Sequence, residues 1–132
     1  MILVTCAGGK TGRAIAAGLA AEGTPVRAMV RRESSMASLD SLGLADICAG
    51  DLANPDDVAR AADGVTAIYY IAPNMNPDER RIGNNMIDAA KKQGSVRFVF
   101  HSVLHPQLEA ASHPPHAGAS QPPQAGASQQ VL

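Results

Sequence analysis

Five short apolar runs, separated by alanine-rich stretches, constrain what this chain can fold into. They recur at intervals of roughly 20 to 25 residues, which is typical of repeated strand–helix–strand units. Within each run the residues are continuously apolar rather than alternating, as expected for parallel strands that are buried on both faces. Parallel neighbours need a long crossover, and the alanine-rich stretches are suited to form crossover helices. The predicted strands cover residues 2–5, 26–30, 46–49, 67–71 and 97–101.

The residues around the predicted helices support this reading. Asn54 and Asn76 are each followed by proline, the order expected for an N-cap and a first helical residue. Glycines stand where helices are expected to end, at Gly23, Gly43, Gly64 and Gly94. One apolar face of a fourth helix is predicted to carry Ile82, Met86, Ile87 and Ala90. The fold class is therefore α/β, a Rossmann-like doubly wound parallel sheet of five strands in the order 3-2-1-4-5.

Composition excludes several classes of function. The 132 residues carry a net charge of −1 with 17% charged residues, so no basic surface for nucleic acid or for an anionic membrane is expected. No apolar stretch approaches the roughly 18 residues of a membrane span, and we expect a cytoplasmic protein. Cys6 and Cys48 fall on the predicted first and third strands, about 10 Å apart, which is too far for a disulfide.

The chain changes character near Glu109. We predict a domain over residues 1–109 and a disordered tail over 110–132, which has no charged or aromatic residue. Within the tail, "PPHAGASQ" is followed at once by "PPQAGASQ", a low-complexity repeat. A ligand for a polyproline-binding partner is the alternative, but the repeat has no P-x-x-P pattern. A flexible tail is the favoured interpretation.

The first predicted strand runs directly into a glycine-rich turn, "TCAGGKTG". A triphosphate-binding P-loop needs a glycine five positions before Gly9, where this chain has Val4, so that interpretation fails. The pattern that remains is G-x-x-G-x-x-G with Cys6 in place of the first glycine. Gly9 would allow the backbone to approach a pyrophosphate, and Gly12 would allow close helix packing. The amides of Lys10, Thr11 and Gly12 would point at the anion.

Residues at the ends of the next two strands suggest which dinucleotide is bound. Arg31, with Arg32 beside it, stands where dinucleotide-binding folds place an acid for NAD or a basic residue for the 2′-phosphate of NADP. NADP, as NADPH, is therefore favoured over NADH, although surface arginines are also common. Asp51 and Leu52 follow the third strand, where they would meet the adenine edge. Asp51 is equally well explained as a turn residue before Asn54.

Together the glycine loop and the segments "GDLANP", "IAPNMNPDE", "IDAAKKQG" and "RFVFHSVLHPQ" resemble the NmrA-like family of atypical short-chain dehydrogenases/reductases, over residues 1–109. The resemblance implies an NADP-binding domain used for quinone or carbonyl reduction, or for sensing the nucleotide redox state. It also implies that Ala72 and Pro73 lie near the nicotinamide side of the cofactor. Fold alone would not license a function, so these assignments depend on the matching motifs.

The resemblance also shows what is missing. Ser102 matches the position of a catalytic serine, but no Tyr-x-x-x-Lys follows it, and the family's substrate-binding region has no counterpart here. We therefore expect an incomplete domain whose catalytic residues are otherwise unknown. A non-catalytic regulatory module is one alternative, and a fragment produced by a frameshift near codon 110 is another.

Two further expectations concern metal ions and self-association. The four histidines, His101, His105, His113 and His116, are interrupted by prolines and lack further ligands, so no metal site is expected. The fifth strand would form an exposed apolar edge, which predicts self-association.

Overall fold

The computed structural model describes residues 1–102 and contains one parallel sheet in that range. Its strands are β1 (Ile2–Val4), β2 (Val26–Val30), β3 (Asp46–Ala49), β4 (Ala67–Ile71) and β5 (Arg97–His101). They lie in the order β3-β2-β1-β4-β5, and every neighbouring pair is parallel. The fold predicted from the sequence is thus confirmed, while the predicted tail over 110–132 lies outside the described residues.

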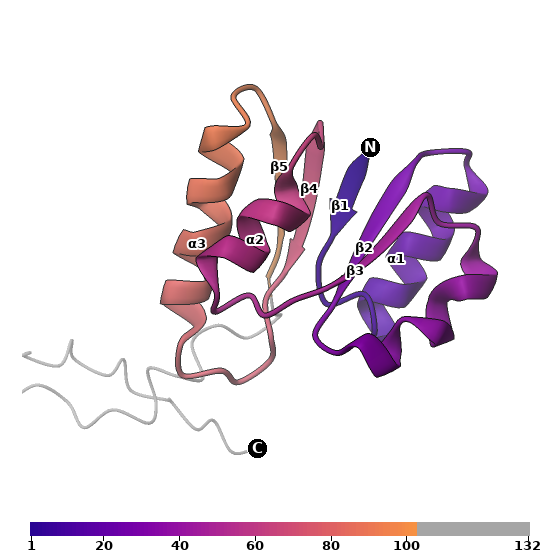
Figure 1. Ribbon diagram of the computed structural model, residues 1–132, viewed down its shortest axis with the longest axis horizontal. Coiled ribbons are helices and arrows are strands. Elements are labelled where there is room, and N and C mark those ends of the chain that lie inside the picture. Colours follow the sequence, from indigo (N-terminus) through magenta and orange to yellow (C-terminus); the bar gives the residue numbers. More distant parts are fainter. Residues whose placement is uncertain (103–132) are drawn as a thin grey trace, which may run out of the picture. The chain divides into compact units, whose positions relative to one another are not determined.

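Helices cover both faces of the sheet (Figure 1). Helix α1 (Lys10–Ala21) packs on one face, and α2 (Pro55–Ala62) and α3 (Glu79–Lys92) pack side by side on the other. Asn54 caps α2 as expected, because its side-chain oxygen accepts a hydrogen bond from the N–H of Asp56 at 3.0 Å. The four predicted helix-ending glycines all have positive φ, at Gly23, Gly43, Gly64 and Gly94.

Two local predictions about helices need correction. Between β2 and β3 the chain forms two short 3-10 helices, η1 (Glu33–Ser35) and η2 (Ala37–Leu42), in place of an α-helix. Asn76 does not cap α3, which starts two residues after Pro77 with Asp78 as its N-cap. The Asn76 side chain instead accepts from the N–H of Asp78 at 2.9 Å, forming a turn ahead of the helix.

The buried face of α3 also differs from the prediction at one position. Ile82 and Met86 are buried, but Ile87 is 43% exposed, and Ala89 is the next buried residue. At about 100° per residue, Ile87 is rotated away from the line through Ile82, Met86 and Ala89.

The core is divided by the sheet. A larger cluster between the sheet and α2–α3 includes Leu3, Met29, Ile68, Ile82 and Met86. On the opposite face two smaller clusters form, one beneath α1 and one beneath η1–η2. Most of the large core residues are contributed by strands and helices, so the loops at the strand ends are largely free to serve other roles.

No helix in residues 1–102 is long and apolar enough to cross a membrane.

Arg27 ties three elements together near the amino ends of the strands. Its guanidinium, with the side chain 18% exposed, pairs with the Asp46 carboxylate of β3 at 2.6 Å. It also donates to the carbonyls of Ala61 and Asp63, at 2.9 and 2.7 Å, at the C-terminal end of α2. Those carbonyls have no further helical turn to bond, so the arginine supplies their hydrogen-bond donors.

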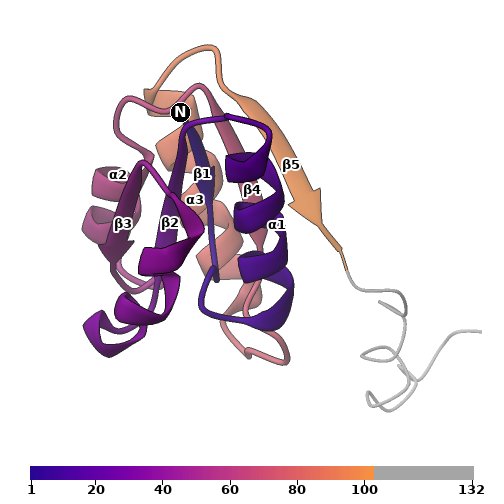
Figure 2. The same cartoon turned by 90° about the vertical axis from the view of Figure 1, so that its right-hand side faces the viewer.

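The two edges of the sheet are unlike. Edge strand β3 has four residues, all half-buried, and its Asp46 is paired with Arg27. Strand β5 lies at the other edge of the sheet (Figure 2). All five of its residues are exposed. Phe98, Val99 and Phe100 are 37%, 50% and 53% exposed, so the apolar edge predicted from the sequence is present.

Tyr70 of β4 is 3% exposed and stacks against Phe100, with ring centroids 5.5 Å apart. Its hydroxyl is buried and has no hydrogen-bond partner among residues 1–102. Burial raises the pKa of Tyr70 to about 12, so the hydroxyl stays protonated well above neutral pH. The unpaired hydroxyl is therefore a local cost to stability.

We expect Tyr70→Phe to raise the free energy of unfolding by about 1 kcal/mol, because it removes a buried hydroxyl that lacks a partner among the described residues. Urea denaturation at pH 7 measures this difference. Because the folded-state pKa of Tyr70 is raised, titration of this residue leaves the free energy of unfolding unchanged below about pH 10. Between about pH 10 and 12 the unfolded chain loses the proton more readily than the folded one, so the free energy of unfolding of the wild type falls. The Phe variant should lack that loss, and a destabilised variant at pH 7 would contradict the prediction.

Candidate functional site

The site is built around the point where β1 ends. Thr5 is fully buried, and its hydroxyl bonds both backbone groups of Ile71, accepting from the N–H at 2.8 Å and donating to the carbonyl at 2.9 Å. The side chain thereby continues the bonding between β1 and β4 past the last β1 residue. The backbone is then free to turn, and Cys6 adopts φ 50, in the left-handed region.

Gly12 is required by close backbone contact. A Cβ built at Gly12 would lie 2.3 Å from the Cys6 carbonyl oxygen and 2.8 Å from the Ala7 Cα. Both are backbone atoms that cannot move without moving the loop. The first turn of α1 therefore lies directly against residues 6 and 7, and only glycine fits there.

Gly9 has a different role from Gly12. Its backbone is extended, with φ −83 and ψ 167, and a Cβ there would lie 3.4 Å from the Cys6 carbonyl oxygen. As the N-cap of α1 it has no side chain to accept hydrogen bonds from the helix. The N–H groups of Lys10, Thr11 and Gly12 consequently bond no acceptor in residues 1–102. Free donors at a helix start favour an anion.

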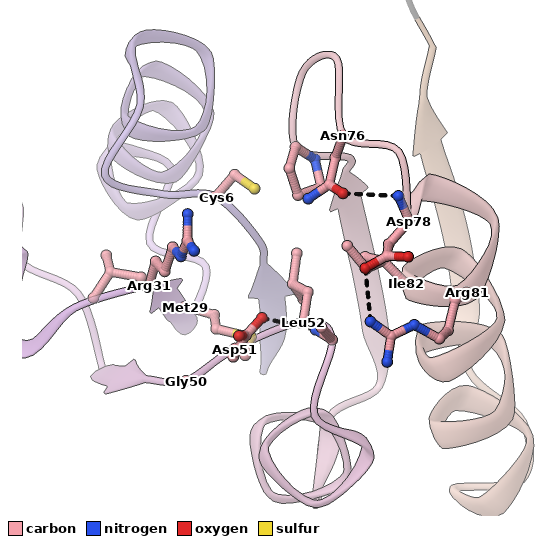
Figure 3. Close-up of a pocket in the computed structure, with 13 residues that line it drawn as sticks. Cys6, Met29, Arg31, Gly50, Asp51, Leu52, Asn76, Asp78, Arg81 and Ile82 are labelled. Atoms are coloured by element: carbon pink, nitrogen blue, oxygen red, sulfur yellow. Dashed lines mark hydrogen bonds and ion pairs between the residues drawn. The ribbon is translucent and has the colours of Figure 1, made fainter.

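A cleft of about 370 Å³ opens beside this loop (Figure 3), a volume in the range of about 300–1,000 Å³ found for small-molecule sites. Its lining brings together five residues proposed from the sequence, which are Cys6, Arg31, Asp51, Leu52 and Pro73. The lining does not include Gly9, Lys10, Thr11, Gly12, Arg32 or Ala72. The glycine loop borders the cleft through Cys6, whose thiol points into it.

The two consecutive arginines separate at the end of β2. Arg31 is exposed and lines the cleft, where it makes no ion pair with any residue in 1–102. Arg32 is also exposed but stands outside the lining, as the N-cap of η1. Only Arg31 of this pair therefore presents its charge to the cleft.

Asp51 fulfils the turn role that its sequence position suggested. One carboxylate oxygen accepts from the N–H of Ala53 at 2.8 Å, and its own N–H donates to the Asp57 carboxylate at 2.9 Å. That backbone bond, together with a bond from Arg60, lowers the pKa of Asp57. The second Asp51 carboxylate oxygen and the Leu52 N–H have no partner in residues 1–102. An acceptor and a donor thus lie next to each other at the cleft.

The Cys6 thiol does not have the properties of a reactive cysteine. A thiol near a helix N-terminus is expected to have a lowered pKa, but burial raises the pKa of Cys6. Burial likewise raises the pKa of Cys48, and both cysteines are free. At neutral pH both side chains are protonated and act as small apolar groups.

One wall of the cleft was not predicted from the sequence. Asn76, Asp78, Arg81 and Ile82 face Arg31 across the cleft (Figure 3). Asp78 and Arg81 form an ion pair at 2.7 Å, and both side chains are more than half exposed. The sequence had indicated only a helix start here, from Asn76 followed by Pro77.

Helix α3 also supports the side of the cleft that Asp51 and Leu52 line. Asn85 donates a hydrogen bond from its side-chain amide to the Leu52 carbonyl, at 3.0 Å. The backbone next to Asp51 is thereby held against α3, which keeps the neighbouring Leu52 N–H in a fixed place at the cleft.

The remaining predicted residues lie elsewhere. Ala72 follows β4 and packs against the larger core cluster. Ser102 is exposed, immediately after β5. His101 bonds Tyr69, with 3.0 Å between Nδ1 and the hydroxyl oxygen, and the other three histidines lie outside the described residues.

A protein-family model described as NAD(P)H-binding matches residues 7–127, which is most of the chain. The chain belongs to this NAD(P)H-binding family. A curated relative, sterol demethylase protein B of Methylococcus capsulatus, is 31% identical over 109 residues, covering 76% of this chain and 33% of the relative. This chain therefore spans about a third of that relative's length.

Solved structures agree with the family assignment. The NADPH-dependent quinone oxidoreductase of Escherichia coli, in complex with NADPH, has 25% identity and a TM-score of 0.70 over 80% of this chain and 38% of its own. A short-chain dehydrogenase/reductase superfamily protein of Agrobacterium tumefaciens, with bound NAD, has 29% identity and a TM-score of 0.64 over 81% and 34%. This chain is thus an NAD(P)-binding domain related to such reductases.

The contact at Gly12 leads to a matched pair of variants in one helix. Gly12→Ala should lower the free energy of unfolding by about 2 kcal/mol or more, because its Cβ would collide with the backbone at Cys6 and Ala7. Gly18→Ala should raise it by about 0.5–1 kcal/mol, because a Cβ there would meet nothing within 4 Å beyond the helix's own neighbouring backbone, and alanine favours the helix. Urea denaturation of both variants checks this, and equal effects would contradict it.

Proposed function

We propose that this chain binds NADP(H), with the adenosine half in the cleft and the pyrophosphate at the start of α1. The observation that carries the proposal is Arg31, a guanidinium on the cleft wall at the end of β2 with no ion pair in residues 1–102. A planar guanidinium suits the 2′-phosphate that distinguishes NADP from NAD. Arginine, and not a carboxylate, follows the last residue of β2, where an NAD-specific site would present an acid to the ribose.

Two further features support the same cofactor. The free N–H groups of Lys10, Thr11 and Gly12 suit the pyrophosphate, since they combine hydrogen-bond donors with the positive end of the helix dipole. The free carboxylate oxygen of Asp51 and the N–H of Leu52 suit the adenine edge, which offers an amino donor beside a ring-nitrogen acceptor. Ala72 and Pro73 would lie toward the nicotinamide.

In the whole protein, we propose, this domain serves an NmrA-like reductase acting on quinones or related carbonyl compounds. The bound nicotinamide would supply the hydride. The residues of this chain would bind and orient the cofactor, and Ser102 is the candidate for contact with the substrate.

A non-catalytic module that senses NADPH is the second candidate. Tyr70 lies on the strand that leads into the site, yet it is buried with its pKa raised to about 12, which makes it unsuited to donate a proton. Binding of NADPH by thermal shift, beside NADPH oxidation with a panel of quinones, separates the candidates. Turnover favours the reductase, and binding without turnover by the full-length protein favours the sensor.

Replacing Arg31 tests the choice of cofactor. Arg31→Ala should weaken NADPH binding about 10- to 100-fold and leave NADH binding within about 2-fold, because only NADPH carries the 2′-phosphate. Arg32→Ala is the matched control, since Arg32 is adjacent and exposed but outside the cleft lining. Isothermal titration of both nucleotides measures the effect. Equal losses for NADPH and NADH would refute the 2′-phosphate assignment.

Cys6→Gly should tighten NADPH binding several-fold. Glycine adopts the left-handed conformation of this position without strain, and it removes a side chain from the cleft wall beside the phosphate site. Cys6→Ala is the control, because it removes the sulfur but keeps the Cβ. Improvement in both variants identifies the sulfur as the obstruction, and improvement in glycine alone identifies the backbone. Unchanged or weaker binding by Cys6→Gly would show the prediction to be wrong.

A further inference from the structure

The loop between β3 and α2 is fixed by hydrogen bonds to its neighbours. The N–H of Gly50 donates to the Val30 carbonyl of β2, at 2.9 Å. The N–H of Asp51 donates to the Asp57 carboxylate of α2, also at 2.9 Å. Within the loop, the Asp51 carbonyl accepts from the N–H of Asn54 at 2.9 Å. Backbone that is bonded at successive peptide groups has few orientations open to it.

The peptide unit between Leu52 and Ala53 is bonded at both ends. Its carbonyl accepts from the side-chain amide of Asn85 on α3, at 3.0 Å. Its N–H donates to one oxygen of the Asp51 carboxylate, at 2.8 Å. A peptide unit is planar and rigid, so the direction of its carbonyl sets the direction of its N–H. Through this unit the Asn85 amide therefore orients the Asp51 carboxylate.

Two polar groups of the loop have no partner in residues 1–102, namely the second carboxylate oxygen of Asp51 and the N–H of Leu52. Both residues line the cleft, where they lie next to each other (Figure 3). Leu52 is 7% exposed, and its side chain packs in the larger core cluster. A backbone N–H on so buried a residue is costly to leave unbonded, which favours an acceptor on a ligand.

We propose that Asn85 is a positioning residue through which the cleft selects adenine over other purines, an inference that rests on the proposed binding of NADP(H). Adenine presents its N6 amino donor beside the N1 acceptor, and these complement the Asp51 oxygen and the Leu52 N–H. Hypoxanthine presents the O6 acceptor beside an N1–H donor, so both pairings are lost. Fixed polar groups reject such an analogue, because they are left unpaired in its complex.

Asn85 acts on the base only through the loop, since it is outside the cleft lining. Its amide is the one donor to the Leu52 carbonyl in residues 1–102. Without it the peptide unit is free to rotate, and the Asp51 carboxylate rotates with it. Asp57 holds the same loop from α2, but its carboxylate bonds Arg60 and the N–H of Asp51, neither of which faces the base.

Titration with two bases tests the proposal in the full chain. Isothermal titration compares NADPH with its deamino analogue, which carries hypoxanthine in place of adenine. We expect the wild type to bind NADPH about 10- to 100-fold more tightly than the analogue. Asn85→Ala should reduce this ratio to about 3-fold or less, because the two groups that meet the base are no longer fixed. Asn84→Ala should keep the wild-type ratio, since Asn84 is adjacent and exposed and its side chain makes no hydrogen bond in the described part of the chain.

The ratio separates positioning from a merely structural role, because a loosened fold would weaken the binding of both nucleotides alike. Both also carry the 2′-phosphate, so the contribution of Arg31 cancels. Asn85→Asp is a second variant of nearly the same shape, and its ionised carboxylate has no proton to donate, so it should lose the ratio as well. An unchanged ratio in either Asn85 variant, or equal affinities in the wild type, would overturn the inference and leave NADP(H) binding in place. A wild type that binds neither nucleotide would overturn the proposed function, and this inference with it.

Discussion

The hydroxyl of Thr5 is the contact on which the geometry of the site depends. By bonding both backbone groups of Ile71, it lets β1 stop after three residues while the sheet stays closed at that end. The freed backbone turns sharply at Cys6, whose carbonyl then lies against Gly12 and accepts from the N–H of Gly9 at 3.0 Å. The start of α1 is thereby held against Cys6, which lines the cleft. One buried side chain thus links the sheet, the turn and the helix that borders the site.

The architecture was accessible from the sequence because its signals are local and agree with one another. Continuous apolar runs predicted all five strands, four of them to the residue, and four glycines predicted where segments end. Strand β1 ends one residue earlier than predicted, at Val4. The cause is the one that allows the turn at Cys6, since Thr5 bonds β4 through its side chain as well as its backbone. The segment from Glu33 to Leu42 forms 3-10 turns because it carries serines at four of its ten positions, and serine competes with the helical backbone for hydrogen bonds.

The cleft was only partly accessible from the sequence. Arg31 and Asp51 follow strands, so their place at the carboxyl edge of the sheet follows from topology alone. Asn76, Asp78 and Arg81 approach the cleft because the chain doubles back at Met75, which has φ 55 and is 90% exposed. No residue preference signals a left-handed methionine. The sequence also did not show that Arg31 lines the cleft and Arg32 does not. This depends on which of two adjacent side chains the turning backbone directs toward the cleft.

Arg27 holds β2, β3 and the end of α2 together near the amino ends of the strands, at the opposite end of the sheet from the cleft. The residues that would meet a ligand contribute little to that fastening, and those that fasten the sheet are remote from the ligand. Such a separation allows the loops at the carboxyl edge to diverge in length and chemistry at low risk to folding. A domain organised in this way is a good recipient for grafted loops, since a new recognition surface can be installed at one end of the sheet while Arg27 preserves the other.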